Sequence, residues 1–504
     1  MVRPVGDLPT SRLNPYRLPD GAVPGRAAGA PQPAGPDSEA TQRLAVTPRA
    51  EPPTDRIPVT GDPSAPPPTS AGEPGTTGDD PQNGKIGDGL ALSIASALGS
   101  VAGLLSWLIA AWIMPQAEVG RATEFVSAFQ LIGGAAQLNL GIGLMRWLPG
   151  AGKKSVRLVW ASLLVIMPLS GLIGLVYGII VPSIAETAAG ADGSFGFGLL
   201  LLVLACAGWG VFVVHDFIVV ALGRPWVAVW RNGTFAVVRI GLLLLLGSAY
   251  AAEGMVLSWV VPIVLWIAGG SVVIWFIVRR YAARSGPGVL PSRDEALRFL
   301  GPTALAQLGN ALLYNQVPLL VNLRLGNEAG AAFFICWQAV TVVDIAAVFF
   351  MNSLSVHTAR EPHRAAELAR SARKRMLILF LPVLALGAAL GYPVLSILGE
   401  GYAAAAPALA VLMIGLAFRL LVVFELAQRQ ASGDGMGFAR IQLTNTGLIL
   451  AVAAFVPLGV FGEVPLDTLL MPVVIGYVVV QALCALVVMF LPTLRRRFRP
   501  EVKS

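Results

Sequence analysis

From residue 86 onward the chain is a succession of apolar stretches, each long enough to form a helix that crosses a membrane. The hydrocarbon core of a bilayer is about 30 Å thick, and a helix needs about 20 apolar residues to cross it. Helices and closed barrels satisfy the hydrogen bonds of their own backbone inside lipid. Continuous apolar runs are typical of helices. Only 13% of the residues are charged, against about 25% in soluble domains. The sequence therefore predicts an all-α polytopic membrane protein.

Twelve such stretches can be placed, six in each half of the membrane portion. The predicted membrane helices cover about 89–113, 124–147, 158–181, 197–222, 226–249, 255–278, 300–321, 331–353, 376–398, 404–427, 438–460 and 468–491. Lys and Arg concentrate in cytoplasmic loops, which gives the orientation. With the N-terminus inside, the cytoplasmic segments hold 24 Lys and Arg, and the external loops hold only Arg121 and Arg324. We therefore predict a multi-pass protein of the cytoplasmic membrane with both termini cytoplasmic.

The first 85 residues have a different composition from the rest. They contain 18 of the 37 prolines and one aromatic residue, Tyr16. A segment of this kind cannot bury enough apolar surface to offset its chain entropy. The predicted organisation is a disordered, Pro-rich cytoplasmic tail (1–85), a first lobe (86–285), a second lobe (286–494) and a basic cytoplasmic tail (495–504).

A short motif repeats with a shift of 210 residues. The first predicted helix leaves the membrane through 117–120 (Ala-Glu-Val-Gly), the seventh leaves through 327–330 (Asn-Glu-Ala-Gly), and an apolar, aromatic-containing helix follows each. Six helices is an even number, so both halves enter the membrane from the same side. This is the parallel-repeat arrangement of some secondary transporters, and we expect two six-helix lobes related by an axis along the membrane normal.

The sequence lacks the patterns that other classes of protein function require. After residue 85 the chain has 28 basic and 19 acidic residues, so the basic excess belongs to the membrane portion and not to a soluble face that binds nucleic acid. Three distant cysteines and three histidines predict no metal or cofactor site. No GxSxG, P-loop or HExxH motif is present, and the longest predicted external loop, about 182–196, is too short for a catalytic domain. We predict that the chain is not an enzyme.

Two stretches of the sequence resemble a known superfamily. The first is 114–120 (MPQAEVG), followed by 140–144 (LGIGL) and 146–149 (RWLP). It resembles the opening of polysaccharide-export flippases of the multidrug/oligosaccharidyl-lipid/polysaccharide (MOP) superfamily. The second runs from 215–216 (HD) through 221–224 (ALGR) to 231–232 (RN), and resembles helices 4 and 5 of actinobacterial members.

The resemblance covers about 86–491 and implies a polysaccharide-biosynthesis flippase of the O-antigen or capsule type. The lipid II flippase branch usually carries two additional helices, which this sequence lacks. Many relatives also place an acidic residue near Asn315 and Gln316, and this chain does not. If that acid couples ion flow in the relatives, coupling must differ here.

Two arginines are candidate ligands for the phosphates of a lipid-linked glycan. Ionisable side chains inside membrane helices are costly, by roughly 2.5–3.5 kcal/mol on insertion scales, and are functional candidates by default. Arg239 and Arg419 lie deep in predicted helices, one in each half, and guanidinium binds phosphate through a bidentate fork. We expect at least one to line the cavity. The structural alternative is an ion pair with Asp344, which would neutralise one arginine and leave the other uncompensated.

Asp216 and Arg231 are nearly equidistant from the turn at Gly223 between the fourth and fifth predicted helices. They should face each other at one depth, which predicts a structural ion pair. Asp344, Asp216 and His215 are the candidates for ion coupling, His215 because imidazole titrates near neutral pH. For His215 the alternative is a simple hydrogen bond to a neighbouring group.

Three further residues are substrate-binding candidates. Arg146, at the inner end of the second predicted helix, could recruit head groups, or it could simply obey the positive-inside rule. Asn315 and Gln316 lie with Pro318 in an otherwise apolar run. They suit a bendable helix that lines a cavity, and they equally suit hydrogen bonding between helices.

Three functions remain open at this stage. The first is a flippase that moves a lipid-linked oligosaccharide or polysaccharide precursor by alternating access. The second is a multidrug or metabolite antiporter, which would need acidic residues in the first lobe, where Asp216 is the one we place at depth. The third is a scaffold for cell-envelope biosynthesis proteins. The expected partners are the lipid-linked glycan and, for the basic stretches 360–375 and 495–503, anionic membrane lipids.

Overall fold

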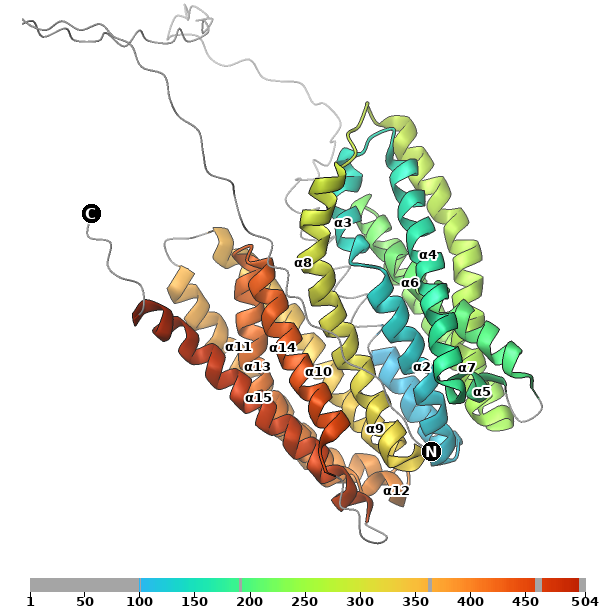
Figure 1. The fold of residues 1–504 in the computed structure, drawn as a ribbon, viewed down its shortest axis with the longest axis vertical. Helices are drawn as coiled ribbons and strands as arrows, with labels where there is room; N and C mark the ends of the chain where they lie inside the picture. Colours follow the sequence, from blue (N-terminus) through green and yellow to red (C-terminus); the bar gives the residue numbers. More distant parts are fainter. Residues whose placement is uncertain (1–98, 100, 190–192, 361–364, 458–464, 498–504) are drawn as a thin grey trace, which may run out of the picture. The chain divides into compact units, whose positions relative to one another are not determined.

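The computed structural model describes residue 99 and residues 101–189, 193–360, 365–457 and 465–497, and these residues are almost wholly helical (Figure 1). They contain no strand, only one isolated backbone bridge, between Gly152 and Pro287. All of them belong to one structural unit, Thr77–Ser504. The predicted tail 1–85 and the beginning of the first predicted helix lie outside the described residues.

The helices follow the predicted order in both halves. The first half contains a helix at Val101–Ile113, then α2 (Gln116–Ala136), α3 (Leu140–Trp147), η1 (Leu148–Gly150), α4 (Ser155–Ile180), α5 (Pro182–Ala189), α6 (Phe195–Ala221) and α7 (Pro225–Arg284). The second half contains α8 (Arg293–Ala311), η2 (Leu312–Gln316), α9 (Val317–Leu325), α10 (Asn327–Arg360), α11 (Ala365–Ser396), α12 (Glu400–Ala403), α13 (Ala406–Ala431), α14 (Gly435–Phe455) and α15 (Leu466–Arg497).

Each of the twelve predicted membrane helices has a counterpart among these elements. Among the described residues, eight helices are long and apolar enough to cross a membrane, and the number is nine if the pair α2 and α3, bent by 40°, counts as one span. The helix α7 contains two predicted helices, because its backbone breaks at Ala251 (φ 46°, ψ −119°). The chain folds back tightly there, since a Cβ on Gly254 would overlap the Leu246 carbonyl. The continuous run from α8 to α9 is the seventh predicted helix.

Helix α11 begins at Ala365, well before its predicted start at 376. Another early start, at the second predicted helix, bears on the buried charges. This helix begins at Gln116, eight residues before the predicted start at 124, with Pro115 as its N-cap. Proline has a fixed φ and lacks a backbone N–H, so it is tolerated at a helix start. The same span is broken at Leu138 and Asn139, which both have positive φ (49° and 56°). At the other end of the chain, α15 extends to Arg497, past the predicted boundary at 494.

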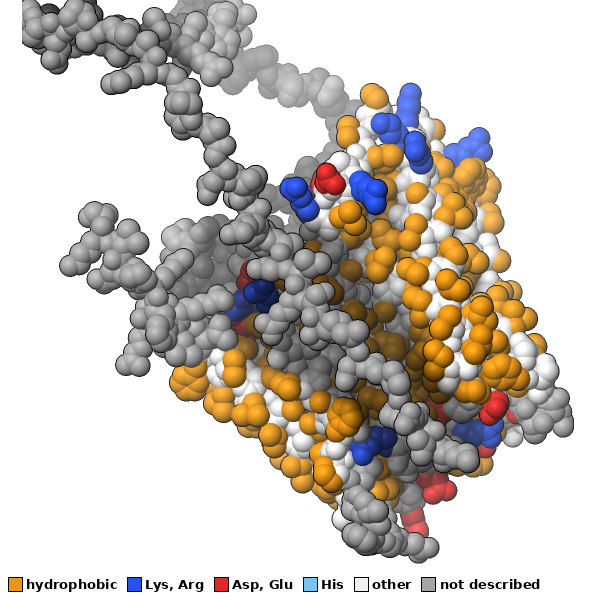
Figure 2. All heavy atoms as spheres, in the orientation of Figure 1, with side chains coloured by type: hydrophobic (Ala, Val, Ile, Leu, Met, Phe, Trp, Pro, Cys, Tyr) orange, Lys and Arg blue, Asp and Glu red, His pale blue; other side chains and the backbone are white. Residues whose placement is uncertain are grey.

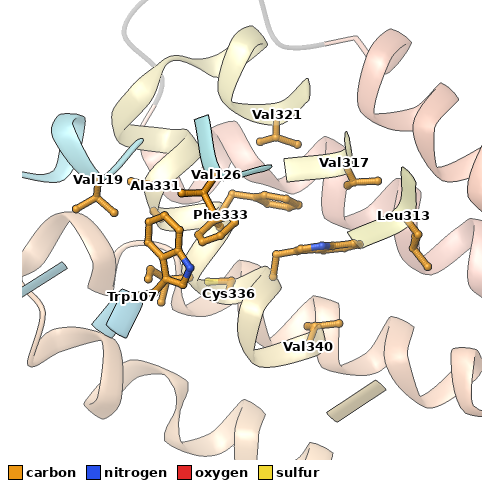
Figure 3. Close-up of a cluster of buried hydrophobic side chains, with 14 of the residues drawn as sticks. Trp107, Val119, Val126, Leu313, Val317, Val321, Ala331, Phe333, Cys336 and Val340 are labelled. Carbon is orange, nitrogen blue, oxygen red and sulfur yellow. The ribbon is translucent and has the colours of Figure 1, made fainter. Parts of the chain in front are cut away.

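The two halves share one apolar core. Within the first half α4 packs on α6 and α6 on α7, and within the second half α13 packs on α10, α11 and α15. Between the halves, α2 packs against α8, α9 and α10. Figure 3 shows the result, with Trp107 and Val126 of the first half lying in one cluster with Val317, Val321 and Phe333 of the second.

The outer surface of the helices is apolar. Large hydrophobic side chains on α4, such as Leu164 and Ile180, are about 70% exposed (69% and 71%), and hydrophobic side chains cover the flanks of the bundle in Figure 2. An exposed apolar surface of this extent marks an interaction with a membrane or a partner. Here it covers the sides of helices that are long enough to span a bilayer.

The polar ends of the bundle can be told apart by their contacts. At one end residues 148–154 meet residues 281–292, where the Lys153 N–H donates to the Gly286 carbonyl (3.1 Å) and the Tyr281 hydroxyl donates to the Pro149 carbonyl (2.8 Å). Figure 2 shows Lys and Arg gathered there, and we call it the basic end. At the opposite end α2 and α10 begin. The positive-inside rule predicts that the basic end is cytoplasmic.

Candidate functional site

Arg239 lies inside the first half without an acidic partner. It projects from α7 toward the helix Val101–Ile113, and its Nη2 donates to the Ala102 carbonyl (2.8 Å) and to the Ser106 hydroxyl. The residue is 3% exposed. No carboxylate among the described residues pairs with it, and its Nε has no hydrogen-bond partner among them.

Aromatic rings complete the surroundings of Arg239. Its guanidinium carbon lies 4.1 Å from the centre of the Trp259 ring and 5.8 Å from that of Phe235. Cation–π contacts contribute about 0.5–2 kcal/mol, which offsets part of the cost of removing a charge from water but does not neutralise it. Arg239 is therefore a buried cation that the described protein groups leave electrically uncompensated.

Arg419 is equally buried in the second half, at 2% exposure, but it has a carboxylate partner. Its Nε lies 3.5 Å from Oδ1 of Asp344 on α10. The guanidinium also donates to the side-chain oxygens of Asn445 (3.1 Å) and Gln442 (3.4 Å) on α14. Asp344 accepts a further bond from the Tyr314 hydroxyl (2.8 Å). Of the two arginines, Arg419 is thus the one that pairs with Asp344.

The polar network around Arg419 continues through the second half. Asn445 exchanges hydrogen bonds with Gln481 of α15 (3.1 and 3.4 Å). Gln442 donates to Thr446, whose hydroxyl in turn donates to the Gly309 carbonyl of α8. Five spans meet in this network, in which Arg419 Nε and Asp344 Oδ1 make an ion-pair contact and have no hydrogen-bond partner among the described residues. Such networks fix the relative positions of the elements that they join.

Asp216 and Arg231 face each other across the α6–α7 hairpin. Arg231 Nη2 lies 2.6 Å from Asp216 Oδ1, and the Asn232 amide donates to Asp216 Oδ2 (2.9 Å). Arg231 also donates to the Phe212 carbonyl (2.7 Å) and stacks over the Phe212 ring at 3.7 Å. The structure therefore brings these two candidates together as an ion pair. In this conformation the Asp216 carboxylate already contacts the Arg231 guanidinium and the Asn232 amide.

His215 is buried beside this pair but does not join it. Its ring lies against Gly270 of α7, and neither ring nitrogen has a hydrogen-bond partner within the described part of the chain. The hydrogen bond that we considered from the sequence is absent from those residues. Burying polar ring nitrogens without hydrogen-bond partners is costly.

Arg146 is exposed at the basic end. Its guanidinium lies over the Phe299 ring (4.7 Å), beside a cavity of about 550 Å³ that also receives Arg298 and the carboxylates of Asp294 and Glu295. The two acids offset the two arginines. This cavity is therefore mixed in charge, and it does not adjoin Arg239 or Arg419.

Asn315 and Gln316 lie on a π-helical turn, η2 (Leu312–Gln316), just before Pro318. Asn315 donates to the Ala311 carbonyl of its own helix (3.0 Å), and Gln316 lies beside Tyr177 of α4. A π turn is a local widening that often occurs at functional sites. The backbone is irregular where the sequence suggests a bendable helix, and Gln316 reaches toward the other half.

Glu124 is an acid at depth that the sequence reasoning missed. It is 6% exposed, and its Oε1 accepts a hydrogen bond from the amide of Asn322 on α9 (2.7 Å). The expectation that Asp216 is the one acid at depth in the first lobe was wrong. The signal was Pro115, because a helix that starts there places Glu124 in its third turn and not at its end.

Within the described ranges, no group of three His, Cys, Asp or Glu side chains is close enough to hold a metal ion. The site is instead a set of buried charges distributed over two halves. Arg239 and Glu124 lie in the first half without an oppositely charged partner in contact, and the Arg419 network lies in the second.

Solved structures with the same fold are transporters. The chain is similar to an inward-facing multidrug resistance MATE family transporter of the MOP superfamily (TM-score 0.59, 16% identity, 81% of this chain and 99% of that chain). It is also similar to an outward-facing MATE family transporter (TM-score 0.56, 17% identity, 84% and 98%). A MOP superfamily transporter from Pyrococcus furiosus, described as having a binding pocket of reverse polarity, matches with a TM-score of 0.56, 17% identity and the same coverage.

A scan against protein-family models finds no match, and a search of curated proteins finds none either. The likeness to solved structures therefore establishes the fold, that of a MATE-like twelve-helix protein. At 16–17% identity it does not carry over a cargo or the residues that bind one.

Proposed function

We propose that this chain is a membrane transporter that moves a lipid-linked glycan across the cytoplasmic membrane by alternating access of its two halves. The cargo would present a pyrophosphate to the protein interior and keep its lipid tail in the bilayer. The MATE-like fold supports the transport cycle, since structures of that fold are described in both inward-facing and outward-facing conformations. The cargo class is supported by the chain's own charges.

The single observation that carries the proposal is the uncompensated guanidinium of Arg239. Burying an unpaired charge is expensive, so a membrane protein that keeps one has a use for it. An anion is the ligand that recovers this cost, and guanidinium and phosphate form paired, charge-assisted hydrogen bonds. A lipid-linked glycan carries phosphate at the junction of its lipid and its sugars, which is where an intramembrane arginine can reach it.

The contacts of Arg239 in this conformation can be exchanged for those of an anion. Its acceptors are a hydroxyl, Ser106, and a carbonyl, Ala102, both neutral and both on the helix Val101–Ile113. Movement of that helix would free the Nη2 donor while the rings of Trp259 and Phe235 remain on α7 itself. Arg419 differs, because a phosphate would have to displace the Asp344 carboxylate. We therefore assign cargo binding to Arg239 and a structural role to Arg419.

Glu124 favours a second candidate, a multidrug or metabolite antiporter of the same fold. A buried carboxyl without a cationic partner is suited to binding a cationic drug or a coupling ion. The two candidates differ in the residue that meets the cargo. A glycan flippase depends on Arg239 for cargo affinity, whereas an antiporter of cationic drugs depends on Glu124 and gains from the removal of a nearby positive charge.

The test is depletion of the protein in its native host, followed by mass spectrometry of lipid-linked glycans with a probe of leaflet accessibility. We expect one pyrophosphoryl-polyprenol glycan to accumulate on the cytoplasmic leaflet, and its mass identifies the cargo. An unchanged lipid profile with the surface polysaccharide intact would overturn the proposal and favour the antiporter or the scaffold.

A further inference from the structure

The two copies of the repeated sequence motif meet at the end of the bundle opposite the basic end. Gly120 of the first copy lies against Asn327 of the second, and a Cβ on Gly120 would overlap the Asn327 carbonyl. The Gln116 side-chain amide donates to the Glu328 carbonyl (2.8 Å). Deeper in the core, the Trp107 ring packs edge-on against Phe334 at 4.5 Å between centres. The two halves are thus closed on each other at this end.

Glu124 lies one helical turn beyond Gly120, inside this closed contact. Its carboxyl belongs to the first half and is held by Asn322 of the second, which is 1% exposed. The same Asn322 amide nitrogen also donates to the Asn327 side chain (3.1 Å), and the amide lies on Gly330, where a Cβ would overlap it. The glycines of both motif copies therefore make the close approach that buries the Glu124 carboxyl.

The surroundings of Glu124 do not supply a cation for it in this closed arrangement. The elements at this end carry the following charged or titratable groups: Glu118 and Arg121 of α2, Tyr177 of α4, Glu186 of α5, Tyr250 and Glu253 of α7, Tyr314 of η2, Arg324 of α9, Glu328 of α10, and Glu400 and Tyr402 of α12. Arg121 is the cation that acts on the Glu124 carboxyl, but it is paired with Glu118 (2.9 Å). Arg324 donates to the Ala453 and Val456 carbonyls at the end of α14.

We propose that Glu124 is a proton-binding site that links closure of this end of the transporter to proton uptake. With the halves closed, the carboxyl is removed from water and its donors, the Asn322 amide and the Ser183 hydroxyl, are neutral. Burial then favours the protonated form. With the halves apart, water solvates the carboxylate. The closed form then binds one more proton than the open form, so lower pH stabilises the closed form. The positive-inside prediction places this end outside the cell, where the proton would enter.

This inference rests on the proposed function only in requiring that the two halves separate here. The test measures that separation directly, with full-length protein in lipid nanodiscs and no cargo. Cys206, Cys336 and Cys484 are replaced by alanine, and spin labels are attached at Glu186→Cys in the first half and Glu400→Cys in the second. Both positions are exposed, and distances between the labels are recorded from pH 5 to pH 8.

We expect the ratio of closed to open protein to rise as the pH falls, by up to about tenfold per pH unit for one linked proton. Glu124→Gln, which resembles the protonated carboxyl, should be closed at every pH. The control Glu253→Gln removes another carboxyl at this end and should keep the response. Asn322→Asp places a second carboxyl against Glu124, and two carboxyls sharing a site retain a proton to higher pH, so its response should move to higher pH.

Each outcome of these measurements either supports or overturns the proton-binding role of Glu124. A distance distribution that does not change with pH overturns the inference, and so does a response that survives Glu124→Gln or an Asn322→Asp response that does not move. If Glu124→Gln does not fold, the Asn322→Asp shift and the response of the parent protein still decide. Because no cargo is present, a failed glycan assay leaves this result unaffected, and a failed pH response leaves the glycan proposal standing.

Discussion

The two halves bury one arginine each in very different surroundings. In the second half Arg419 meets a carboxylate and two side-chain amides, and the hydrogen bonds continue to Thr446 and Gln481. In the first half Arg239 meets a carbonyl, a hydroxyl and two aromatic rings. The same residue type thus serves as part of the internal support in one half and as an uncompensated charge in the other.

This difference shows that burial alone does not identify a binding residue. Arg239 and Arg419 are 3% and 2% exposed, so their solvent exposure does not separate them. What separates them is whether a partner of opposite charge is built into the protein. A charge that the protein neutralises stabilises the fold, and a charge that it leaves open is available to a ligand.

Breaking the second-half network should have the largest effect on stability. Asp344→Asn removes the negative charge and leaves Arg419 buried and unpaired, which costs about 3–5 kcal/mol of unfolding free energy. Thermal unfolding in detergent measures it. The double variant Asp344→Met with Arg419→Met removes both charges and should recover most of the loss. Equal stability of Asp344→Asn and the parent protein would mean that the pair does not support the fold.

The Asp216–Arg231 pair provides an intermediate case for the comparison. Asp216→Asn should cost about 1–2 kcal/mol, less than Asp344→Asn, because Arg231 retains the Phe212 carbonyl and ring and because the Asp216 side chain is 18% exposed. The same unfolding measurement checks it. A loss as large as that of Asp344→Asn would show that the first half also depends on an ion pair for its stability.

His215 tests whether the absence of a partner is enough to mark a functional residue. His215→Leu removes two unpartnered nitrogens from an apolar site, so we expect stability to remain within about 1 kcal/mol of the parent or to rise. Transport and its pH dependence should be unchanged. Loss of the pH dependence in a transport assay would instead make His215, and not Glu124, the residue that senses protons.

Removal of residues 1–85 should have the smallest effect. The residues to which we assign cargo binding and proton binding all lie in the membrane portion. The truncated protein should therefore transport at close to the full rate in vesicles. Loss of surface polysaccharide in cells that express the truncated protein, together with normal transport in vesicles, would favour a scaffold that recruits cell-envelope proteins.

The sequence predicts the helices well because hydrophobic length and the positions of Lys and Arg are local signals. It also predicts the proximity of Asp216 and Arg231, since a hairpin places residues equidistant from its turn at one depth. The repeat at 117–120 and 327–330 indicates two related segments, but only the fold shows that Gly120 of the first packs against Asn327 of the second. That contact joins residues about 200 positions apart, and amino-acid composition does not predict it.

The charges were harder to predict than the helices. The sequence identifies Arg239, Arg419 and Asp344 as a set in which one arginine must remain unpaired, but not which one, because pairing depends on how α10 and α13 pack. Glu124 was missed through an error of eight residues in a helix start. The positive φ angles of Leu138 and Asn139 occur without a Gly at either position. Asn adopts this conformation more readily than most residues, but Leu does not.

The central claim is that Arg239 is kept unpaired in order to bind the anionic part of the cargo. Its most direct test compares purified parent protein, Arg239→Met and the exposed control Arg224→Gln in vesicles that contain a lipid-linked pyrophosphate glycan on one leaflet. We predict that Arg239→Met folds with a stability close to that of the parent protein but exposes the glycan on the far leaflet at least about tenfold more slowly, since charge-assisted bonds contribute about 1.5–3 kcal/mol. Arg224→Gln should match the parent. Transport by a folded Arg239→Met at the parent rate would contradict the claim.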